Sequence, residues 1–487
     1  MVGSLNPTAL VRLLGPWNSG ALPAYRELAD VVRLLVMDGR IPLDVALPSE
    51  RALAQALNLS RTTVTAAYAA LREQGFLTAG QGSRGRTCIP HRTSPVSAPG
   101  LAIPEGLTDF AYASLPAAGE VVHRAFADAL TDLPALLPGF GYDAVGVVAL
   151  RKAIAEKYCA EGVPTSEEQI LVTSGAQHAL NIVLRTLAGK QDKVLVEHPT
   201  YPNALDAIRA AGCKPLPVGL PGTISRTSPG WDMDAMMTTM RQQRPAMAYL
   251  VPDFHNPTGR VMSDLQRRVL VRAAAAAGTV LVVDETLRAL NLDDVRTAPM
   301  ASFGPGVVSI GSLSKSHWAG LRTGWIRAEE ELIARFVSVR AIMDLGGSVV
   351  EQLAAARLVR SFDEPLNERL SALRENREYL LGLLGEHLPS WEAERPRGGL
   401  TVWCRLPTPS STALTVLAPD FGVRLAAGPR FGVGGAFEQY LRVPFTLPPA
   451  KLEAAILAIR AAQDKLDAAP HLRRDLATGQ PPAVAVA

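Results

Sequence analysis

The sequence predicts a multidomain protein: a small winged helix-turn-helix, then a mainly parallel α/β domain, then a smaller α+β domain. The length of 487 residues is greater than that of one ordinary domain. Near the N-terminus, two short helical patterns are joined by a tight turn. Between Gln169 and about Arg327, short β-branched runs alternate with helix-like segments, which is typical of a parallel sheet covered by helices on both faces.

Composition limits the classes of protein to which the chain can belong. Hydrophobic residues make up 48% and charged residues 20% of the sequence, which is ordinary for a protein with large buried cores. The four cysteines, Cys88, Cys159, Cys213 and Cys404, have neither a disulfide-framework nor a metal-site spacing. No apolar run reaches membrane-spanning length, and the N-terminus has no signal-peptide pattern. We therefore expect a cytoplasmic protein without a metal site or a membrane segment.

The N-terminal region has the pattern of three short helices. Apolar residues recur at helical spacing over Tyr25–Asp38. After a turn, Ser49 can cap a second helix, and Ser60 can cap a third that runs from Arg61 to about Gln74. The second and third helices, separated by a tight turn, predict a helix-turn-helix whose polar start is free to enter a DNA major groove.

Two short β runs and an excess of positive charge follow the helices. Phe76–Ala79 and Arg86–Ile89 can pair as a small β wing. Between Ser49 and Arg92 there are six arginines and two glutamates, a net charge of +4, whereas the whole chain has +3. This excess favours DNA phosphates as a partner, although a small helical subdomain without DNA contacts would also satisfy the pattern.

This region resembles the winged helix-turn-helix of GntR-type bacterial regulators. The matching segments are Leu47–Ala54, Leu59–Val64, Ala67–Tyr68 and Gly75–Leu77. The resemblance implies that double-stranded DNA is contacted by Arg51, Ser60, Arg61, Thr62 and Thr63, and at the tip of the wing by Gln81, Gly82 and Arg84. The wing departs from the family at Ser83–Gly85, where Gly-Ser-Gly is usual.

A second motif, Ser312–Arg322, follows an apolar run, Val307–Ile310, that predicts a buried strand. A lysine at such a strand end, here Lys315, can lose its proton on desolvation and attack an aldehyde to form a Schiff base. Ser312, Ser314 and Arg322 are suited to a phosphate, because they combine neutral donors with a planar cation. The combination indicates pyridoxal 5′-phosphate (PLP), although a solvated loop is the alternative for this motif alone.

Four earlier positions fit the same cofactor. Asp284 ends a predicted strand, where its carboxylate can pair with a protonated pyridine nitrogen. Asn256 can contact the phenolic oxygen of the ring, and Tyr201 can stack on its face. Ser174, Gly175, Ala176 and Gln177 open a helix whose backbone N–H groups can hold a phosphate. Singly, each position has a common structural explanation as a turn, a cap or a core side chain.

In this order, the motifs make residues 108–466 resemble a fold-type I PLP-dependent aminotransferase. The resemblance implies that Lys315 is the Schiff-base lysine, and that Arg442 grips the α-carboxylate of an amino ligand. It also implies that Tyr142 reaches the phosphate of a neighbouring subunit in a homodimer. At position 286 the family often has a tyrosine that contacts the phenolic oxygen; Thr286 is too short for this role, which puts full catalytic tuning in doubt.

Composition divides the chain into regions. The stretch 90–107 is rich in Pro, Ser, Ala and Gly and predicts a linker, and the C-terminal residues lack an apolar period. The expected regions are a DNA-binding domain at 20–89, the linker at 90–107, an aminotransferase-like domain at 108–466 with large and small subdomains at about 142–340 and 341–466, and a disordered tail at 467–487.

A winged helix-turn-helix joined to an aminotransferase-like domain resembles the MocR subgroup of GntR regulators. This resemblance implies a PLP-dependent transcriptional regulator whose homodimer binds a two-part operator and responds to an amino acid, an amine or PLP itself. The alternative is an active aminotransferase with a secondary DNA-binding head, because Lys315, Asp284 and Arg442 are all present.

Overall fold

The structure is a computed structural model that describes residues 4–15, 17–18, 23–37, 41, 45–78, 85–88, 107–220 and 230–468. The chain forms two compact units. One contains the N-terminal residues to Asp109, Thr408–Leu441 and the segment that begins at Leu457, and the other contains Phe110–Pro407 and Arg442–Ile456. Of the predicted linker only residue 107 is described, and of the predicted tail only residues 467–468, which end the last helix.

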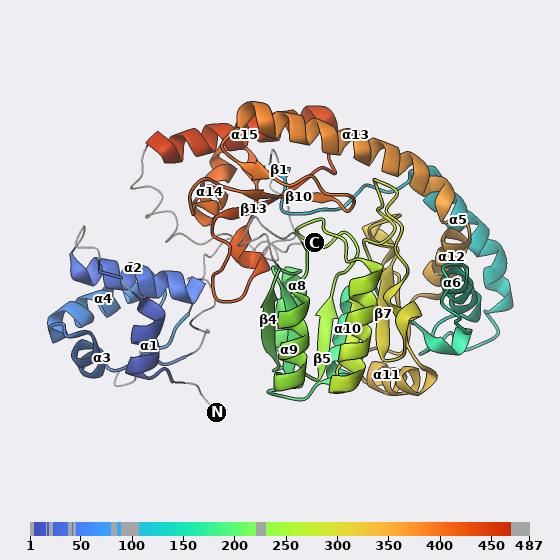
Figure 1. Ribbon diagram of the computed structural model, residues 1–487, viewed down its shortest axis with the longest axis horizontal. Coiled ribbons are helices and arrows are strands. Elements are labelled where there is room, and N and C mark those ends of the chain that lie inside the picture. Colours follow the sequence, from blue (N-terminus) through green and yellow to red (C-terminus); the bar gives the residue numbers. More distant parts are fainter. Residues whose placement is uncertain are drawn as a thin grey trace. The chain divides into compact units, whose positions relative to one another are not determined.

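The N-terminal region contains the predicted helix-turn-helix. Its helices are α1 (Pro7–Leu14), α2 (Ala24–Met37), α3 (Glu50–Leu57) and α4 (Arg61–Glu73) (Figure 1). The Ser49 side chain accepts a hydrogen bond from the N–H of Ala52, and the Ser60 side chain accepts one from the N–H of Thr63. Both predicted caps are therefore present, and they satisfy backbone donors that a helix start leaves without a partner.

A short antiparallel pairing follows α4. Leu77 forms a β-bridge with Thr87, and the N–H of Thr78 donates to the carbonyl of Arg86 at 2.9 Å. The predicted wing is present at its base, whereas its tip, with Gln81, Gly82 and Arg84, lies outside the described residues. The helices share a core in which the side chains of Leu28, Val32, Leu53, Val64 and Leu71 are buried, so this head has a hydrophobic core of its own.

The larger unit is built on a seven-stranded sheet. In order across the sheet, the strands are β2 (Ile170–Thr173), β8 (Gly324–Arg327), β7 (Val307–Ser312), β6 (Val280–Asp284), β5 (Met247–Leu250), β3 (Lys193–His198) and β4 (Lys214–Gly219). Every pairing is parallel except the two made by β8, which is antiparallel to both β2 and β7. The predicted fold class, with its mainly parallel sheet, is confirmed.

Two of these strands, β4 and β8, lack the β-branched runs by which strands were predicted from the sequence. β4 contains Pro215 and Pro217, which lower its β signal, but an edge strand tolerates proline because one side makes no ladder. β8 is only Gly324–Arg327, too short for a periodic pattern, and pairing on both sides holds it in the sheet.

Helices cover the sheet. They are α5 (Gly119–Asp132), α6 (Val148–Ala160), α7 (Ala176–Leu187), α8 (Pro202–Ala210), α9 (Met233–Gln243), α10 (Asp264–Ala277), α11 (Glu330–Met343) and α12 (Val349–Arg360). In Figure 1, α9 and α10 lie against the strands, and Met240 of α9 and Leu270 of α10 share a buried cluster with Leu281 and Val283 of β6. This packing fixes β6, and therefore the position of Asp284 at its carboxyl end.

The C-terminal part alternates helices with short strands. Its elements are α13 (Asp363–His387), β9 (Glu392–Ala393), β10 (Thr401–Arg405), α14 (Ser411–Leu417), β11 (Val423–Arg424), β12 (Ala426–Ala427), β13 (Tyr440–Pro444) and α15 (Pro449–Ala468), and β1 (Thr108–Asp109) pairs with β11. β9 and β10 are antiparallel, and the N–H of Phe445 donates to the carbonyl of Leu400 at 3.0 Å. The C-terminal part therefore has the mixture of helices and strands that the sequence predicts for it.

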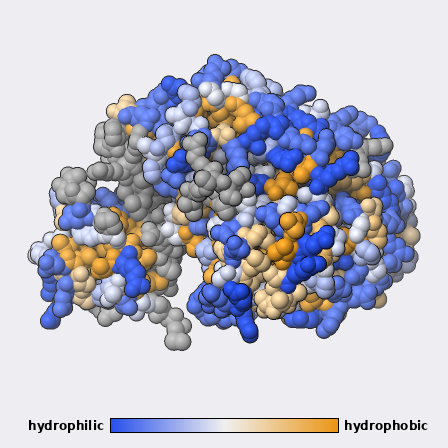
Figure 2. Space-filling view, in the orientation of Figure 1, coloured by the Kyte–Doolittle hydropathy of each residue, from blue (hydrophilic) through white to orange (hydrophobic). Residues whose placement is uncertain are grey.

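One face of the molecule is predominantly polar among the described residues. On the face shown in Figure 2, most of the described residues are hydrophilic, and apolar residues form separate patches among them. Within the described part of the chain, no helix combines the length and the apolar character that crossing a membrane requires.

Candidate functional site

A cavity of about 140 Å³ lies beside the carboxyl ends of β5, β6 and β7. Ligands of open α/β folds bind at this edge of the sheet. The predicted cofactor residues that line the cavity are Ala176, Gln177, Tyr201, Asn256, Asp284, Ser312, Ser314, Lys315 and Arg322. The structure therefore brings together side chains from segments that are far apart in the sequence.

Lys315 lies in the loop after β7 and is half-buried. Its Nζ donates to the carbonyl of Ala113 at 2.9 Å and to Oγ of Ser114 at 3.4 Å. Burial, together with the positive charge of Arg442, lowers the pKa of the Lys315 amine to about 8, and the Asp284 carboxylate partly opposes this shift. A lysine with a lowered pKa has more of its neutral, nucleophilic form near neutral pH.

Asp284 is held at the end of β6 by two donors. The hydroxyl of Tyr249 donates to Oδ2 of Asp284 at 2.6 Å, and the N–H of Thr286 donates to Oδ1 at 3.0 Å. Burial and the nearby Asp284 carboxylate raise the pKa of Tyr249 well above its usual value, which keeps the phenol protonated as a donor. This role could not be predicted from the sequence, because Tyr249 falls within β5 and has the appearance of a core residue.

The start of α7 and the guanidinium of Arg322 form a second corner of the cavity. Gly175 has a positive φ of 91°, and a Cβ placed on it would lie 2.8 Å from Nη2 of Arg322. Nη2 of Arg322 donates to the carbonyl of Ser174 at 2.9 Å, whereas the N–H of Ser174 donates to Nδ1 of His178 at 3.1 Å. At the start of α7, the backbone N–H groups that follow Ser174 remain as donors, and the Arg322 guanidinium lies beside them.

Two serines lie next to this corner. The hydroxyl of Ser312 donates to the carbonyl of Thr323 at 2.9 Å and lies 2.8 Å from the hydroxyl of Ser314. The N–H of Ser314 also donates to Oγ of Ser312 at 3.1 Å. Arg322, neutral hydroxyls and a helix start together make a donor set suited to a phosphate group.

Arg442 lies on β13 and is fully buried. Its Nη1 donates to Oδ1 of Asn256 at 3.4 Å, and its Nη2 donates to the carbonyl of Ala111. Arg442 does not line the cavity, but it contacts Asn256, which does. The hydroxyl of Tyr201, also in the lining, accepts from Nδ2 of Asn203 at 2.9 Å, and burial raises the pKa of this phenol to about 12.

Three other predicted residues do not line the cavity. Ser174 and Gly175 lie directly before the start of α7, where they contact Arg322. Tyr142 is 75% exposed and lies in a loop that is joined by a β-bridge, Asp143 to Gly346, to the segment after α11. Tyr142 therefore presents its ring to the surface of the unit to which it belongs.

In the head, the predicted DNA contacts gather at the start of α4. The Ser60 hydroxyl lies 2.7 Å from the hydroxyls of both Thr62 and Thr63, and the Arg61 side chain is 73% exposed. Arg51 is exposed on α3. The carboxylate of Glu50, on α3, lies 4.0 Å from Nε of Arg61 and accepts a hydrogen bond from the Thr65 hydroxyl at 2.8 Å. Both partners are on α4, so Glu50 links the two helices of the motif.

The fold and this cavity define the class: an aminotransferase-type α/β domain that carries a winged helix-turn-helix head. The family model for aminotransferase class I and II matches residues 140–459, more than half of the chain, and the chain belongs to this family. The model for bacterial regulatory proteins of the gntR family matches residues 24–86. The combination is a MocR-type architecture.

Similar proteins carry both kinds of name. The HTH-type transcriptional regulator YdfD of Bacillus subtilis is 27% identical over 445 residues, which cover 84% of this chain and 89% of that protein. A 2-aminoadipate transaminase of Thermus thermophilus is 30% identical over 314 residues, covering 62% of this chain and 78% of that one. A third similar protein is LysN, an α-aminoadipate aminotransferase of the same species, whose crystal structure is in complex with N-(5′-phosphopyridoxyl)-L-leucine. It is 27% identical, with a TM-score of 0.68, and the match covers 75% of this chain and 94% of LysN.

Membership of the aminotransferase family indicates pyridoxal phosphate as the cofactor. The residues present fit this group. The cavity combines a desolvated lysine amine, a carboxylate at a strand end, and a corner of hydroxyl, backbone and guanidinium donors. These are the chemical types that an aldehyde, a pyridine nitrogen and a phosphate require.

Proposed function

We propose that the protein is a PLP-dependent, DNA-binding transcriptional regulator whose aminotransferase-like domain senses PLP, an amino compound, or both. The proposal rests on one observation. The chain has a gntR-family head in which the start of α4, the second helix of the helix-turn-helix, is exposed and capped. The same chain contains a cavity in which the pKa of Lys315 is lowered. A regulator requires a surface for DNA and a site for a signal, and this chain has a candidate for each.

In this proposal, each residue of the cavity has a defined task. Lys315 holds the cofactor covalently, and Asp284 pairs with the pyridine nitrogen. Asn256 contacts the phenolic oxygen, and Tyr201 stacks on the ring. The phosphate is held by the helix start at Ser174, Gly175, Ala176 and Gln177, and by Ser312, Ser314 and Arg322. The bound cofactor supplies an electron sink for amine chemistry.

The surrounding protein prepares these groups. Tyr249 and Thr286 keep the Asp284 carboxylate directed at one position, so that its charge does not reorient when a ligand binds. Burial leaves the Lys315 amine readier to lose its proton. Thr286 lies in the lining, but its side chain is too short to reach the phenolic oxygen as a tyrosine would.

The effector in this proposal is an amino acid or an amine. An amino acid places its amine at the cofactor and its carboxylate on Arg442, whose planar fork suits a carboxylate. The fully buried Arg442 guanidinium donates hydrogen bonds to Asn256 and to the Ala111 carbonyl. A carboxylate that docks on Arg442 would replace these hydrogen-bond partners. Such an exchange can couple ligand binding to a conformational change, with a coupling free energy of about 1–3 kcal/mol.

We further propose that the protein is a homodimer. Apolar side chains are exposed near Tyr142 and on the segment joined to it by the Asp143–Gly346 bridge. They include Leu137 at 67%, Phe140 at 99%, Ile342 at 87% and Leu345 at 58% exposure. Exposed apolar patches of this kind mark interaction surfaces, and in a dimer the Tyr142 ring can reach the partner's phosphate site.

The region boundaries remain part of the proposal: a DNA-binding domain at 20–89, a linker at 90–107, a cofactor domain at 108–466, and a tail at 467–487. In the dimer, two heads recognise a two-part operator.

The alternative is a catalytically active aminotransferase. Lys315, Asp284 and Asn256 lie around one cavity, and a similar protein is named as a 2-aminoadipate transaminase. These are the residues that a transaminase also requires. Thr286, which cannot reproduce the tyrosine contact, favours a sensor with weak turnover over an efficient enzyme.

The test combines DNA binding with turnover. Purified protein is titrated onto a fluorescent duplex that spans the DNA flanking its own coding region, with and without PLP and a panel of amino acids and amines. Borohydride treatment and peptide mass spectrometry then locate the cofactor, with Lys315→Ala as the control. The proposal expects sequence-specific binding that the ligand changes and a cofactor adduct at Lys315. Efficient transamination without any effect on DNA affinity would support the enzyme instead.

A further inference from the structure

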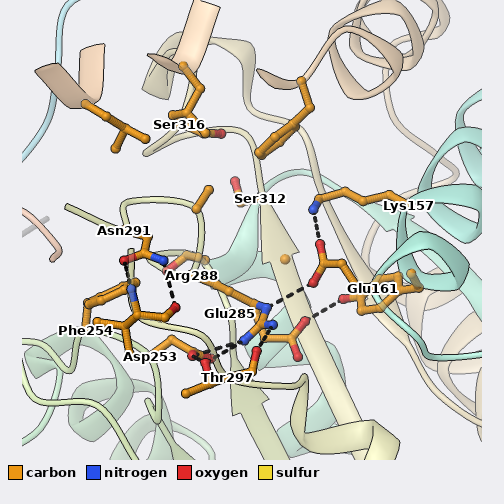
Figure 3. Close-up of a pocket in the computed structure, with 18 of the residues that line it drawn as sticks. Lys157, Glu161, Asp253, Phe254, Glu285, Arg288, Asn291, Thr297, Ser312 and Ser316 are labelled. Atoms are coloured by element: carbon orange, nitrogen blue, oxygen red, sulfur yellow. Dashed lines mark hydrogen bonds and ion pairs between the residues drawn. The ribbon is translucent and has the colours of Figure 1, made fainter. Parts of the chain in front are cut away.

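A second cavity, of about 340 Å³, is larger than the cofactor cavity, and Figure 3 shows side chains that line it. Thr286 and Ser312 belong to the lining of both cavities, so the two share a wall. The volume lies within the range of small-molecule sites. None of the cofactor roles proposed above uses this space.

The walls of the second cavity carry more negative than positive charge. Lys157 and Arg288 are its cations, and its anions are Glu161, Asp253, Glu285 and Asp294. Most of these carboxylates have a cation as a partner. Glu161 pairs with Lys157 and with Arg288, Asp253 pairs with Arg288 at 3.1 Å and with Arg267 at 2.7 Å, and Asp294 lies 3.7 Å from Arg374.

Glu285 is the exception. Its Oε1 accepts from the Ser309 hydroxyl at 3.0 Å and its Oε2 accepts from the Tyr158 hydroxyl at 2.7 Å, but among the described residues it forms no ion pair. Both of its hydrogen-bond partners are neutral. Burial raises the pKa of Glu285, and the positive charge of the nearby Arg288 only partly opposes this shift.

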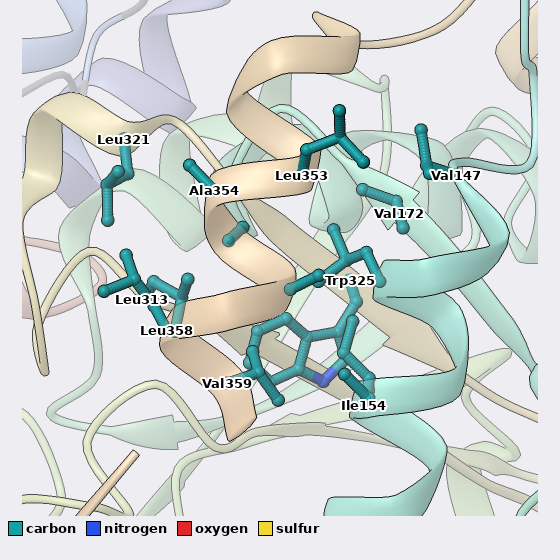
Figure 4. Packing of buried hydrophobic residues seen from close by; sticks show 14 of the residues in the cluster. Val147, Ile154, Val172, Leu313, Leu321, Trp325, Leu353, Ala354, Leu358 and Val359 are labelled. Atoms are coloured by element: carbon teal, nitrogen blue, oxygen red, sulfur yellow. The ribbon is translucent and has the colours of Figure 1, made fainter. Parts of the chain in front are cut away.

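Part of the remaining lining is aromatic and part is polar, the polar side chains being Thr286, Asn291, Thr297, Ser312, Ser316 and Asn367. Trp325 packs in the core between Ile154 and Val359, as Figure 4 shows, and its Nε1 donates to the Tyr158 hydroxyl at 3.2 Å. Phe254 is almost fully buried. Phe362 already faces a cation, since Nζ of Lys157 lies 4.6 Å from the centre of its ring. Such walls suit an apolar or aromatic group, and they also favour a neighbouring positive charge.

We infer that this cavity binds a small organic cation with an apolar or aromatic body, whose charged nitrogen pairs with Glu285. The ligand adds a positive charge to a lining that has four carboxylates and two cations, while Phe254, Trp325 and Phe362 enclose its body. The site is separate from the cofactor site, but Glu285 directly follows Asp284 in the chain.

The test uses a tertiary amine, because a primary amine can also react with the cofactor. N,N-dimethylphenethylamine carries a positive charge and an aromatic ring but cannot form an imine. Its binding to the cofactor-loaded protein is measured by isothermal titration calorimetry, with 2-phenylethanol as the neutral probe. We expect saturable binding of the amine at one site per chain and at least tenfold weaker binding of the alcohol.

Three variants locate the site. Glu285→Gln keeps the size of the side chain and removes its charge, and is expected to weaken amine binding at least tenfold. Glu331→Gln removes an exposed charge on α11 and should leave the affinity unchanged. Lys315→Ala alters the cofactor cavity and should still bind the amine. An unchanged cofactor absorbance band in Glu285→Gln establishes that this variant is folded.

Equal affinity of the wild type and Glu285→Gln would overturn the inference, as would the absence of binding. So would loss of binding in Lys315→Ala alone, because that result would put the amine in the cofactor cavity. If Glu285→Gln does not fold, Phe362→Leu replaces it in the test. An unchanged affinity of that variant for the amine would also contradict the inference. Failure of the proposed function is detected separately, as absent cofactor or DNA binding when no amine is added.

Discussion

The hydroxyl of Tyr249, on β5, donates a 2.6 Å hydrogen bond to Oδ2 of Asp284, at the end of the neighbouring strand β6. Both side chains are buried, with 0% of Tyr249 and 8% of Asp284 exposed. A hydrogen bond to a buried charge contributes more than one between neutral groups. The pair therefore fixes the orientation of the carboxylate that faces the cavity.

Removal of this hydroxyl should weaken cofactor binding. Tyr249→Phe leaves the ring in place and deletes only the donor to Asp284, at an expected cost of about 1.5–3 kcal/mol, the usual worth of a hydrogen bond to a charged group. The measurement is a titration of the cofactor-free protein with PLP, followed by absorbance. Tyr201→Phe is the comparison, because its hydroxyl bonds to Asn203 rather than to Asp284. An unaltered PLP affinity in Tyr249→Phe would show that Thr286 alone orients the carboxylate.

The rate of PLP attachment should depend on the lowered pKa of Lys315. Because burial and the Arg442 charge lower the pKa of this amine from 10.5 to about 8, its neutral form increases as the pH rises through about 8. Attachment to the cofactor-free protein should therefore be half-maximal near pH 8, as followed by stopped-flow absorbance. Arg442→Ala removes a repelling charge and should move this midpoint upward. A wild-type midpoint near 10.5 would contradict the assignment.

Gly175 should be required for the phosphate corner. In Gly175→Ala, the new methyl group would lie 2.8 Å from Nη2 of Arg322, and the residue would keep a φ of 91° that alanine rarely adopts. We expect at least tenfold weaker binding of PLP and little change for pyridoxal, which has no phosphate. Gly382→Ala is the matched control, because Gly382 lies within α13 and nothing lies within 4 Å of its added Cβ. Equal losses for both ligands would indicate general disruption instead.

The start of α4 should determine DNA specificity. Arg61→Ala is expected to cost about 1–3 kcal/mol of operator binding and to relax specificity at one base, because the side chain is 73% exposed at the start of the helix. Fluorescence anisotropy with operator and scrambled duplexes measures both effects. Arg124→Ala, an equally charged change on α5, is the control. Undiminished operator affinity in Arg61→Ala would exclude this residue from the groove.

Arg442 should transmit the effector signal. Arg442→Ala is expected to retain the cofactor and basal DNA binding but to lose the change in DNA affinity on addition of an amino acid, a loss of about 1–3 kcal/mol of coupling. Arg442→Lys keeps the charge without the planar fork and should respond only weakly. Anisotropy titrations with PLP present measure the response. A full response in Arg442→Ala would favour an amine or PLP itself as the effector.

The sequence was informative about side chains at strand ends and helix starts. Asp284, Lys315 and Asn256 could be predicted to lie around one cavity because each stands at or after the end of a recognisable strand, and the carboxyl ends of parallel strands meet at one edge. Ser49 and Ser60 could be identified because a cap depends only on residues three positions apart.

Contacts that depend on distant segments could not be derived in this way. Tyr249 reaches Asp284 because β5 and β6 are neighbours in a particular register. Ser114 lies near Lys315 although the two are separated by 201 positions, and no periodic pattern marks its segment. The cavity beside Glu285 depends in the same way on α6, β7 and the start of α13, which only tertiary packing brings together.

The antiparallel strand β8 has a consequence for how such chains diverge. β7 and β8 hold the two ends of the loop that carries Lys315 and Arg322. Ser312 pairs with Gly324 next to the loop, and Ser309 pairs with Arg327 further along the two strands. A change that slips β8 by one residue along β7 would turn the side chains of β8 to the opposite face and displace the end of the loop near Arg322. Changes confined to the loop leave this pairing intact, so related chains can differ within the loop while β7 and β8 hold its two ends in place.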